Sequence, residues 1–159
     1  MRLYHGSNVE VRRPRLFRSD RRLDFGAGFY LTSSFEQAEK WARLTTRRRK
    51  QGMPLVSVFE FDESRTSGLS VLQFDDASRE WLGFVGDNRK GKAESGAFDI
   101  VAGPVANDNT MPVLRLFFAG IYTEDETIRR LLPQNLKDQY AFKSEAALAA
   151  LRFCEVKAV

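Results

Sequence analysis

The sequence predicts a single α+β domain whose core is a split, mostly antiparallel β-sheet surrounded by helices. Three observations lead to this fold class. At 159 residues the chain suits one domain, residues 1–159, with a substantial core. At least six strand-like segments are scattered among helical ones, without the strict alternation of a doubly wound fold. The glycines of "DFGAGFYLTSS" lie within a strand pattern. The glycine-rich loop that a parallel dinucleotide-binding fold places between strand and helix is therefore absent.

Apolar periodicity and turn residues define the expected elements. Strand patterns cover residues 2–7, 25–32, 55–62, 69–74 and 98–105. Helical patterns cover residues 33–50, 76–89, 111–122 and 124–132. Residues 138–156 read as a strand, a short alanine-rich helix and a further strand.

Capping signals predict where two helices begin. Ser33 or Ser34 is expected to cap the first helix, with Gln37 as the capping-box partner of Ser34. Asp76 is expected to cap the second helix.

The charge is concentrated near the N-terminus. Residues 1–50 hold 13 Lys and Arg against 5 Asp and Glu, a formal charge of +8, whereas residues 51–159 carry −4. The runs "RRPRLFRSDRR" and "RRRK" supply the excess. They form either a solvated surface or a site for a polyanion, such as dinucleotide phosphates, nucleic acid or an acidic partner. Arginine exceeds lysine in both runs, which favours phosphate, because the guanidinium fork pairs well with phosphate oxygens.

Several classes of protein are not expected. Cys154, the single cysteine, lies in the apolar run "LRFCEV" and is predicted to be a small core residue. One cysteine and one histidine cannot supply a zinc site, so no metal is expected. The start of the chain lacks an apolar run of signal-peptide length, and no stretch approaches the roughly 20 apolar residues that cross a bilayer. The expectation is a reduced, cytoplasmic protein without membrane contact.

Three short motifs far apart in the sequence carry the functional signal. The first is "LYHGS", with His5 as the only histidine of the chain. The second is "FGAGFYLTSSFEQAEKW", in which Tyr30 and Trp41 frame the start of a helix. The third is "DQYAF", where Gln139 enters a strand. Glycine inside a strand usually marks a bulge or a close approach to the backbone.

Together and in this order, the motifs resemble the catalytic fold of the ADP-ribosyltransferases, in the histidine-tyrosine branch that contains poly(ADP-ribose) polymerases and diphtheria toxin. That family has a histidine-glycine-serine/threonine strand and then a glycine-x-glycine-x-tyrosine strand leading into a helix with a second aromatic residue. A strand beginning glutamate-tyrosine follows near the C-terminus. The resemblance spans essentially the whole chain. It looks closest to a bacterial family known only as a domain of unknown function that is assigned to this superfamily.

The resemblance implies roles at the nicotinamide end of NAD. His5 would hydrogen-bond a ribose hydroxyl, the backbone of Gly6 would bind the carboxamide, and Ser7 would help to position the ring. Tyr30 would stack on one face of the cationic nicotinamide, and Trp41 is a candidate for the other. Such stacking contributes roughly 0.5–2 kcal/mol per face. The alternative for Trp41 is core packing of an amphipathic helix. Gly26 and Gly28 would provide the bend and close approach that let Tyr30 face the cofactor.

Other polar residues are candidates with weaker support. Arg12, Arg15 and Arg18 follow the histidine strand, where the resembled family often holds adenosine and pyrophosphate. Two polar pairs either line the cleft or form a helix C-cap and an Asx turn, and the structural alternative is preferred: Asn88 with Arg89, and Asn107 with Asp108.

The sequence departs from the family at Gln139. The resembled strand usually begins with a glutamate that binds the nicotinamide-ribose 2′-hydroxyl and stabilises an oxocarbenium-like transition state. Gln139 can hydrogen-bond that hydroxyl, but it has no charge and accepts no proton, and losing a general base costs about 10²–10⁴ in rate. Either the acceptor supplies its own nucleophile, or Asp138 or Glu145 substitutes, or NAD is bound without turnover. Strand alternation points Asp138 away from the face of Gln139.

The function that the resemblance implies is NAD-dependent mono-ADP-ribosyl transfer to a macromolecule, either nucleic acid or protein. Extension to poly(ADP-ribose), which must activate a ribose hydroxyl, is not expected. Bacterial stand-alone domains of this size are commonly toxins of toxin–antitoxin or defence systems, so an antitoxin partner is also implied. Two alternatives remain open: a catalytically inactive module that binds NAD or ADP-ribose, and a basic nucleic-acid-binding protein without a nucleotide site.

Overall fold

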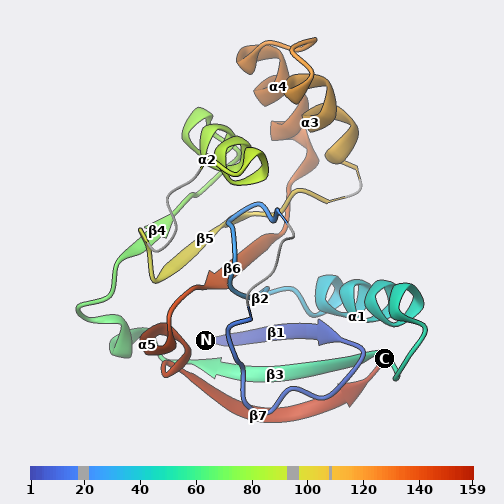
Figure 1. Cartoon of the computed structure of the whole chain (residues 1–159), viewed down its shortest axis with the longest axis vertical. Coiled ribbons are helices and arrows are strands. Elements are labelled where there is room, and N and C mark those ends of the chain that lie inside the picture. Colours follow the sequence, from blue (N-terminus) through green and yellow to red (C-terminus); the bar gives the residue numbers. More distant parts are fainter. Residues whose placement is uncertain (18–21, 93–96, 108) are drawn as a thin grey trace.

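Two β-sheets form the centre of the molecule in the computed structural model, which describes residues 1–17, 22–92, 97–107 and 109–159 (Figure 1). The first sheet has the order β1-β3-β7 and is antiparallel throughout. The second has the order β2-β6-β5-β4, in which β4 and β5 are parallel and the other pairs antiparallel. The strands are β1 (Arg2–Ser7), β2 (Phe29–Leu31), β3 (Leu55–Phe61), β4 (Val71–Gln73), β5 (Ile100–Pro104), β6 (Asp138–Phe142) and β7 (Leu151–Ala158). The predicted α+β class with a split, mostly antiparallel sheet is confirmed.

A single bridge joins the two sheets. Tyr4 of β1 and Thr32, directly after β2, exchange backbone hydrogen bonds of 2.8 and 3.0 Å. Beyond this bridge β1 and β2 diverge, which leaves one edge of β1 uncovered near its C-terminal end (Figure 1).

Helices cover the sheets at both ends of the molecule. Helix α1 (Phe35–Arg49) lies along β1, whereas α2 (Arg79–Lys90), α3 (Met111–Phe118) and α4 (Glu124–Leu131) gather at the opposite end of the second sheet (Figure 1). The short α5 (Glu145–Leu148) connects β6 to β7, and two 3₁₀ turns cover Glu63–Thr66 and Leu132–Gln134. No helix in the described parts of the chain is both long enough and apolar enough to cross a membrane.

Helix α1 begins where the capping signal predicted. The Ser34 hydroxyl accepts a hydrogen bond from the backbone N–H of Gln37, so Ser34 is the N-cap. The Gln37 side chain does not complete the capping box. Its amide instead donates to the carbonyl oxygen of Asp138 at 2.9 Å and to the hydroxyl of Thr32, which ties the helix start to β6.

Three apolar clusters hold these elements together. One fills the space between the sheets and contains Leu3, Phe29, Phe59 and Phe142. A second lies beneath α2, α3 and α4 around the fully buried Trp81. The third is small and packs Ala38 and Ala42 of α1 against Val56 and Tyr4 of the first sheet. Burial of these side chains supplies the main favourable free energy of folding.

Besides the capping box, three local predictions were wrong. The strand expected over residues 25–32 is confined to Phe29–Leu31, because residues 24–28 form a turn in which Gly26 has a φ of +77°. Ser78, rather than Asp76, caps α2. Cys154 is exposed, because it is the extra residue at a bulge of the edge strand β7, between the partners of Val58 and Phe59.

Candidate functional site

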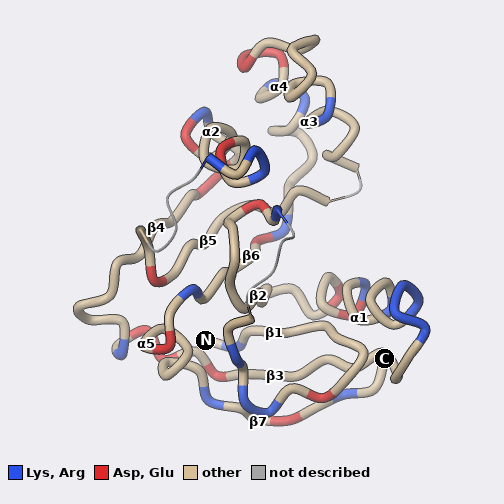
Figure 2. Tube along the Cα trace, viewed as in Figure 1, with Lys and Arg blue, Asp and Glu red and all other residues tan. Residues whose placement is uncertain are grey.

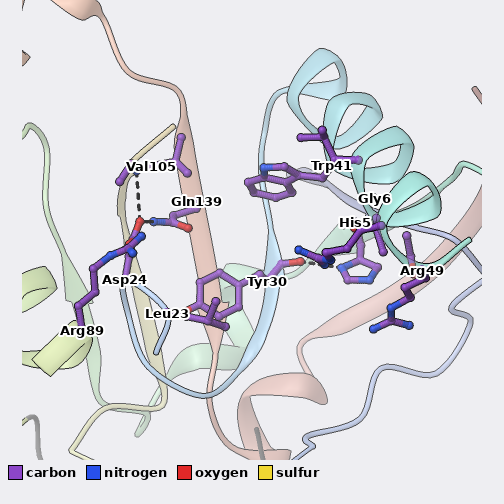
Figure 3. Close-up of a pocket in the computed structure, with 15 residues that line it drawn as sticks. His5, Gly6, Leu23, Asp24, Tyr30, Trp41, Arg49, Arg89, Val105 and Gln139 are labelled. Atoms are coloured by element: carbon purple, nitrogen blue, oxygen red, sulfur yellow. Dashed lines mark hydrogen bonds and ion pairs between the residues drawn. The ribbon is translucent and has the colours of Figure 1, made fainter. Parts of the chain in front are cut away.

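A pocket of about 420 Å³ lies between the uncovered edge of β1, helix α1 and the facing strands β2 and β6 (Figure 3). Residues from both halves of the chain line it: His5, Gly6, Ser7, Leu23, Asp24, Tyr30, Trp41, Leu44, Thr45, Arg48, Arg49, Arg89, Val105, Ala106 and Gln139.

The pocket brings together residues of all three sequence motifs. His5 comes from β1, Tyr30 from β2 and Gln139 from β6, and Trp41 faces the same space from α1 (Figure 3). These residues are separated by up to 134 positions in the sequence, so the pocket exists only in the folded sheet pair.

His5 is fixed in one tautomer. Its Nδ1 lies 2.7 Å from the carbonyl oxygen of Tyr30, which can only accept, so Nδ1 carries the proton and donates. The ring also stacks on Phe29, with centroids 4.3 Å apart. Burial lowers the pKa of His5 from 6.5, against the opposing effect of the hydrogen bond to Tyr30. The imidazole is therefore neutral at pH 7, with Nε2 as a hydrogen-bond acceptor.

Gly6 is required by the packing of α1 on β1. A Cβ at this position would lie 1.9 Å from the carbonyl oxygen of Ala38 and 2.8 Å from the amide nitrogen of Ala42. Tyr4 directs its backbone groups toward Thr32, and strand alternation places the N–H and C=O of Gly6 on the same edge. Among the described residues nothing pairs with Gly6 on that edge, which borders the pocket.

Tyr30 presents its ring to the pocket and its hydroxyl to the preceding turn. The hydroxyl donates to the carbonyl oxygen of Gly26 at 2.6 Å and accepts from the N–H of Phe25 at 3.1 Å. Burial raises the pKa of the Tyr30 phenol, which therefore stays protonated. The ring is held in place by the glycine-containing turn that precedes it.

The two glycines of this turn allow close approaches. A Cβ on Gly26 would meet the side chains of Asn88 and Lys143 at 2.8 and 3.0 Å, and one on Gly28 would meet the carbonyl oxygen of Phe142 at 3.0 Å. The ammonium of Lys143 bonds the carbonyl oxygens of Phe25 and Ala27 and so clamps the turn to the end of β6. Burial lowers the pKa of this lysine.

Gln139 is buried, and its amide nitrogen is hydrogen-bonded within the protein. Its Nε2 donates to the carboxylate of Asp24 at 3.1 Å and lies 3.4 Å from the carbonyl oxygen of Pro104. Asp24 in turn forms an ion pair with Arg89, with an Nε to Oδ1 distance of 2.7 Å. No motif or periodicity in the sequence selects Asp24, and the sequence favours a helix-end role for Arg89. The Arg89–Asp24 ion pair lies at the pocket wall (Figure 3).

Besides Arg89 of α2, the basic residues that line the pocket come from the second arginine run. Arg48 and Arg49 line it, and Figure 2 shows the cationic end of α1 to which they belong. Arg49 also donates to the Asn8 side chain at 3.2 Å. Arg15 is exposed and does not line the pocket, and Arg18 lies outside the described residues. Helical spacing from Trp41 would have identified Arg48, because residues seven apart share a helix face.

The carboxylates considered as substitutes for glutamate lie elsewhere. Asp138 points away from Gln139, as strand alternation predicted, and accepts hydrogen bonds from Thr32 and from Ser33. Glu145 is exposed at the start of α5 and does not line the pocket. The described residues contain no group of three or more potential ligands that could hold a metal ion.

The remaining polar candidates have structural roles. The amide of Asn88 donates to the carbonyl oxygen of Phe84 within α2. The side chain of Asn107 accepts from the N–H groups of Asn109 and Thr110, an Asx turn before α3. Asp108 lies outside the described residues.

The fold and the pocket define an α+β protein with a ligand-sized site at the junction of two sheets. A family model matches residues 1–153, and its description is protein of unknown function (DUF3990). The chain belongs to this family. Comparison with curated proteins found no match, and neither did comparison with solved structures.

Proposed function

We propose that the protein is an NAD-dependent mono-ADP-ribosyltransferase. The pocket would bind the nicotinamide end of NAD, release nicotinamide and pass ADP-ribose to a macromolecule. The observation that carries this proposal is that His5, Tyr30 and Gln139, from three distant motifs, line one pocket in the order and strand context of the resembled family.

The free edge at Gly6 suits a carboxamide. An amide group offers one acceptor and two donors, which complement a strand N–H and C=O that have no strand partner among the described residues. A Cβ at Gly6 would point toward α1 and not toward the pocket. The need for glycine in the packing of α1 is therefore separate from recognition of the carboxamide by the backbone.

Aromatic side chains suit the pyridinium ring. Tyr30 and Trp41 line the pocket from different elements, and a cationic ring between them gains stacking and cation–π attraction. His5 offers Nε2 to a ribose hydroxyl, since its other nitrogen is committed to Tyr30. The two ends of the nicotinamide riboside thus have separate partners.

The transfer breaks the bond between C1′ of the ribose and the pyridinium nitrogen. The electron pair of that bond leaves with nicotinamide, which becomes neutral, while positive charge develops on the ribose. The lone pair of the acceptor then forms the new bond to C1′, and an acceptor that carries a proton on the attacking atom loses it to solvent, whereas a carboxylate has none to lose. Gln139 accepts a hydrogen bond from a ribose hydroxyl but takes up no proton. Target groups that already have an available lone pair, such as a nucleobase nitrogen or a carboxylate, are therefore favoured as recipients of ADP-ribose.

Arg48 and Arg49 are proposed to bind the pyrophosphate. Replacing both with alanine is expected to weaken NAD binding roughly tenfold or more, because charge-assisted pairing to phosphate is lost. Nicotinamide binding should be unchanged, because nicotinamide has no phosphate. Isothermal titration of both ligands tests this, with Arg15→Ala as the control. Equal weakening for both ligands would contradict the assignment.

NAD binding is expected to depend on pH through His5. Because burial lowers its pKa from 6.5, the folded protein binds fewer protons than the unfolded chain just below that pH. Stability should be constant above pH 6.5 and fall between that pH and the lowered pKa. Affinity should fall only as the pH drops through the lowered pKa, where Nε2 becomes a donor. Titrations at several pH values check this. His5→Gln, which does not titrate, should bind more weakly and without this fall.

A transfer assay tests the function itself. The protein is incubated with NAD labelled on the adenylate and with cell extract, and released nicotinamide is measured. Label in protein or nucleic acid, matched by nicotinamide release, is expected. NAD binding without label would identify an inactive reader of NAD. Failure to bind NAD, together with binding of duplex DNA that weakens steeply with salt, would identify a nucleic-acid-binding protein. For such a protein, the slope of log K against log salt concentration is about −0.9 per neutralised phosphate.

The biological setting belongs to the same proposal. A transferase domain of this size suits a cytoplasmic toxin or defence effector, neutralised by an antitoxin partner. The net charge of +4 and the basic end of α1 favour a polyanionic target or a partner with an acidic face.

A further inference from the structure

The orientation of the Gln139 amide is dictated by its neighbours. Two acceptors lie beside its Nε2, the Asp24 carboxylate at 3.1 Å and the Pro104 carbonyl oxygen at 3.4 Å. Only the NH₂ group can face two acceptors without repulsion. The carbonyl oxygen Oε1 must therefore lie on the opposite side, toward the pocket (Figure 3).

Asp24 is itself held by three other contacts. Arg89 approaches Oδ1 through both Nε, at 2.7 Å, and Nη2, at 2.5 Å. The backbone N–H of Ala106 donates to Oδ2 at 3.2 Å, so this oxygen accepts from both Ala106 and Gln139. The Asp24 side chain is only 6% exposed, and no buried polar side-chain atom in the described parts of the chain lacks a partner.

We propose that Asp24 and Arg89 are positioning residues that hold Gln139 with its oxygen toward the ribose hydroxyl, and that the Asp24 carboxylate, one hydrogen bond behind, polarises the amide. Glutamate in the resembled family carries its charge at the ribose. Here the negative charge belongs to Asp24, 115 positions from Gln139 in the sequence, and it acts on the ribose through the neutral amide of Gln139. This inference rests on the proposed function of the pocket.

The contacts form a continuous chain from Arg89 to the ligand. The guanidinium binds the carboxylate, the carboxylate accepts from the amide N–H, and the amide oxygen accepts from the ribose hydroxyl. Hydrogen bonds in such chains polarise one another, and the effect is stronger where water is excluded. Gln139 thereby becomes a better acceptor than an isolated amide, although it still takes up no proton.

A consequence follows for the residue at position 139. Gln139→Glu, which restores the glutamate of the resembled family, would set two carboxylates in direct contact and leave the Pro104 carbonyl oxygen with only its hydrogen bond from Trp81 Nε1, at 2.9 Å. Like charges this close disfavour each other, so one of them would be protonated. Among the described residues, the other ionisable groups that face Asp24 are Arg89 and the Tyr30 phenol. The substitution is therefore expected to lower activity and stability rather than raise them.

Exchanging the two groups is the decisive experiment. Asp24→Asn and Gln139→Glu are made singly and together, with Glu145→Gln as a control carboxylate that lies outside the pocket. Melting temperatures are measured from pH 5 to 8 without NAD, and nicotinamide release is measured to obtain kcat and KM. In the double variant the amide and the carboxylate have exchanged places, so their mutual hydrogen bond can form again, while the hydrogen bond from the Ala106 N–H to position 24 is lost.

Each single variant is expected to lose more of the measured property, melting temperature or kcat, than the double variant does. Gln139→Glu should lower the melting temperature by about 5 °C or more at pH 8, with partial recovery at pH 5. Asp24→Asn should lower kcat about tenfold with little change in KM, as loss of one charge-assisted hydrogen bond predicts. The double variant should recover at least half of each loss, and the control should match the wild type.

Two kinds of failure are distinguishable. If neither the wild type nor any variant releases nicotinamide, but the melting temperatures show the coupling, the proposed function fails and the Asp24–Gln139 interaction stands as structural. If the wild type turns over NAD and the losses of the two single variants simply add in the double variant, the positioning role is overturned. An increase in activity of Gln139→Glu alone would overturn it as well.

Discussion

Replacing Gly6 with alanine is expected to lower the free energy of unfolding by about 3 kcal/mol or more, and the protein is expected to lose its pocket. The new Cβ would lie 1.9 Å from the carbonyl oxygen of Ala38, which belongs to the backbone of α1 and cannot rotate away. Overpacking of a closed interface typically costs about 1–3 kcal/mol, and a backbone clash lies at or above the upper end of that range. Helix α1 would have to shift away from β1.

Urea unfolding followed by circular dichroism measures this effect. Gly83→Ala is the matched control, because Gly83 lies on the exposed side of α2 and an added Cβ there has open space. That control should stabilise the protein by roughly 0.5–1 kcal/mol, since glycine is a poor helix former. Near-neutral behaviour of Gly6→Ala would contradict the packing of α1 on β1.

Replacing Tyr30 with alanine is expected to reduce nicotinamide release by about 100-fold or more while the fold is retained. The substitution removes one face of the proposed ring sandwich and the aromatic wall of the pocket. It also removes the two hydrogen bonds that the hydroxyl makes to the turn before β2, so a modest loss of stability accompanies it. Initial rates of nicotinamide release, with melting temperatures alongside, test this prediction.

Two variants separate the ring from the hydroxyl. Tyr30→Phe keeps the aromatic face and is expected to retain most of the activity with a somewhat lower melting temperature. Tyr122→Ala removes a tyrosine that packs with Arg130 and does not line the pocket, and it should leave turnover unchanged. Full activity of Tyr30→Ala would exclude the transferase mechanism.

The sequence predicted those elements whose signals are local. Alternation in "LVSVFEFD" became β3, and the hydroxyl of Ser34 starts α1 as its cap. The sequence also predicted that His5 and Gln139 lie in strands, because both belong to short apolar runs. Their convergence on one pocket depended on the order of the motifs, which only the resemblance supplied.

Features decided by long-range packing were not predictable. The turn at residues 24–28 looks like strand in the sequence, but Lys143 and Asn88 approach Gly26 from elsewhere in the fold. The exposure of Cys154 follows from a bulge on an edge strand, which an apolar run does not reveal. The pairing of Asp24 with Gln139 spans 115 positions and has no periodic signal.

The arginines of the pocket illustrate a different limit. The sequence contains two basic runs, and the resemblance favours Arg12, Arg15 and Arg18 of the run after the histidine strand. Among the described residues the end of α1, and not Arg15, lines the pocket. Helix α1 lies along β1 (Figure 1), and its last turn reaches beyond the end of that strand, where Arg49 donates to Asn8. The geometry of helix on strand, rather than composition, decides which charges meet the ligand.

The central claim is that the pocket beside His5 binds the nicotinamide end of NAD, and the single imidazole of the chain provides the most direct test. With one histidine, its ring signals in a nitrogen–proton NMR spectrum are assigned without ambiguity. Titration with nicotinamide, which is not consumed, and with NAD is predicted to shift these signals in a saturable manner, whereas AMP should leave them nearly unchanged. Unshifted imidazole signals at saturating NAD, in a protein that remains folded, would contradict the account.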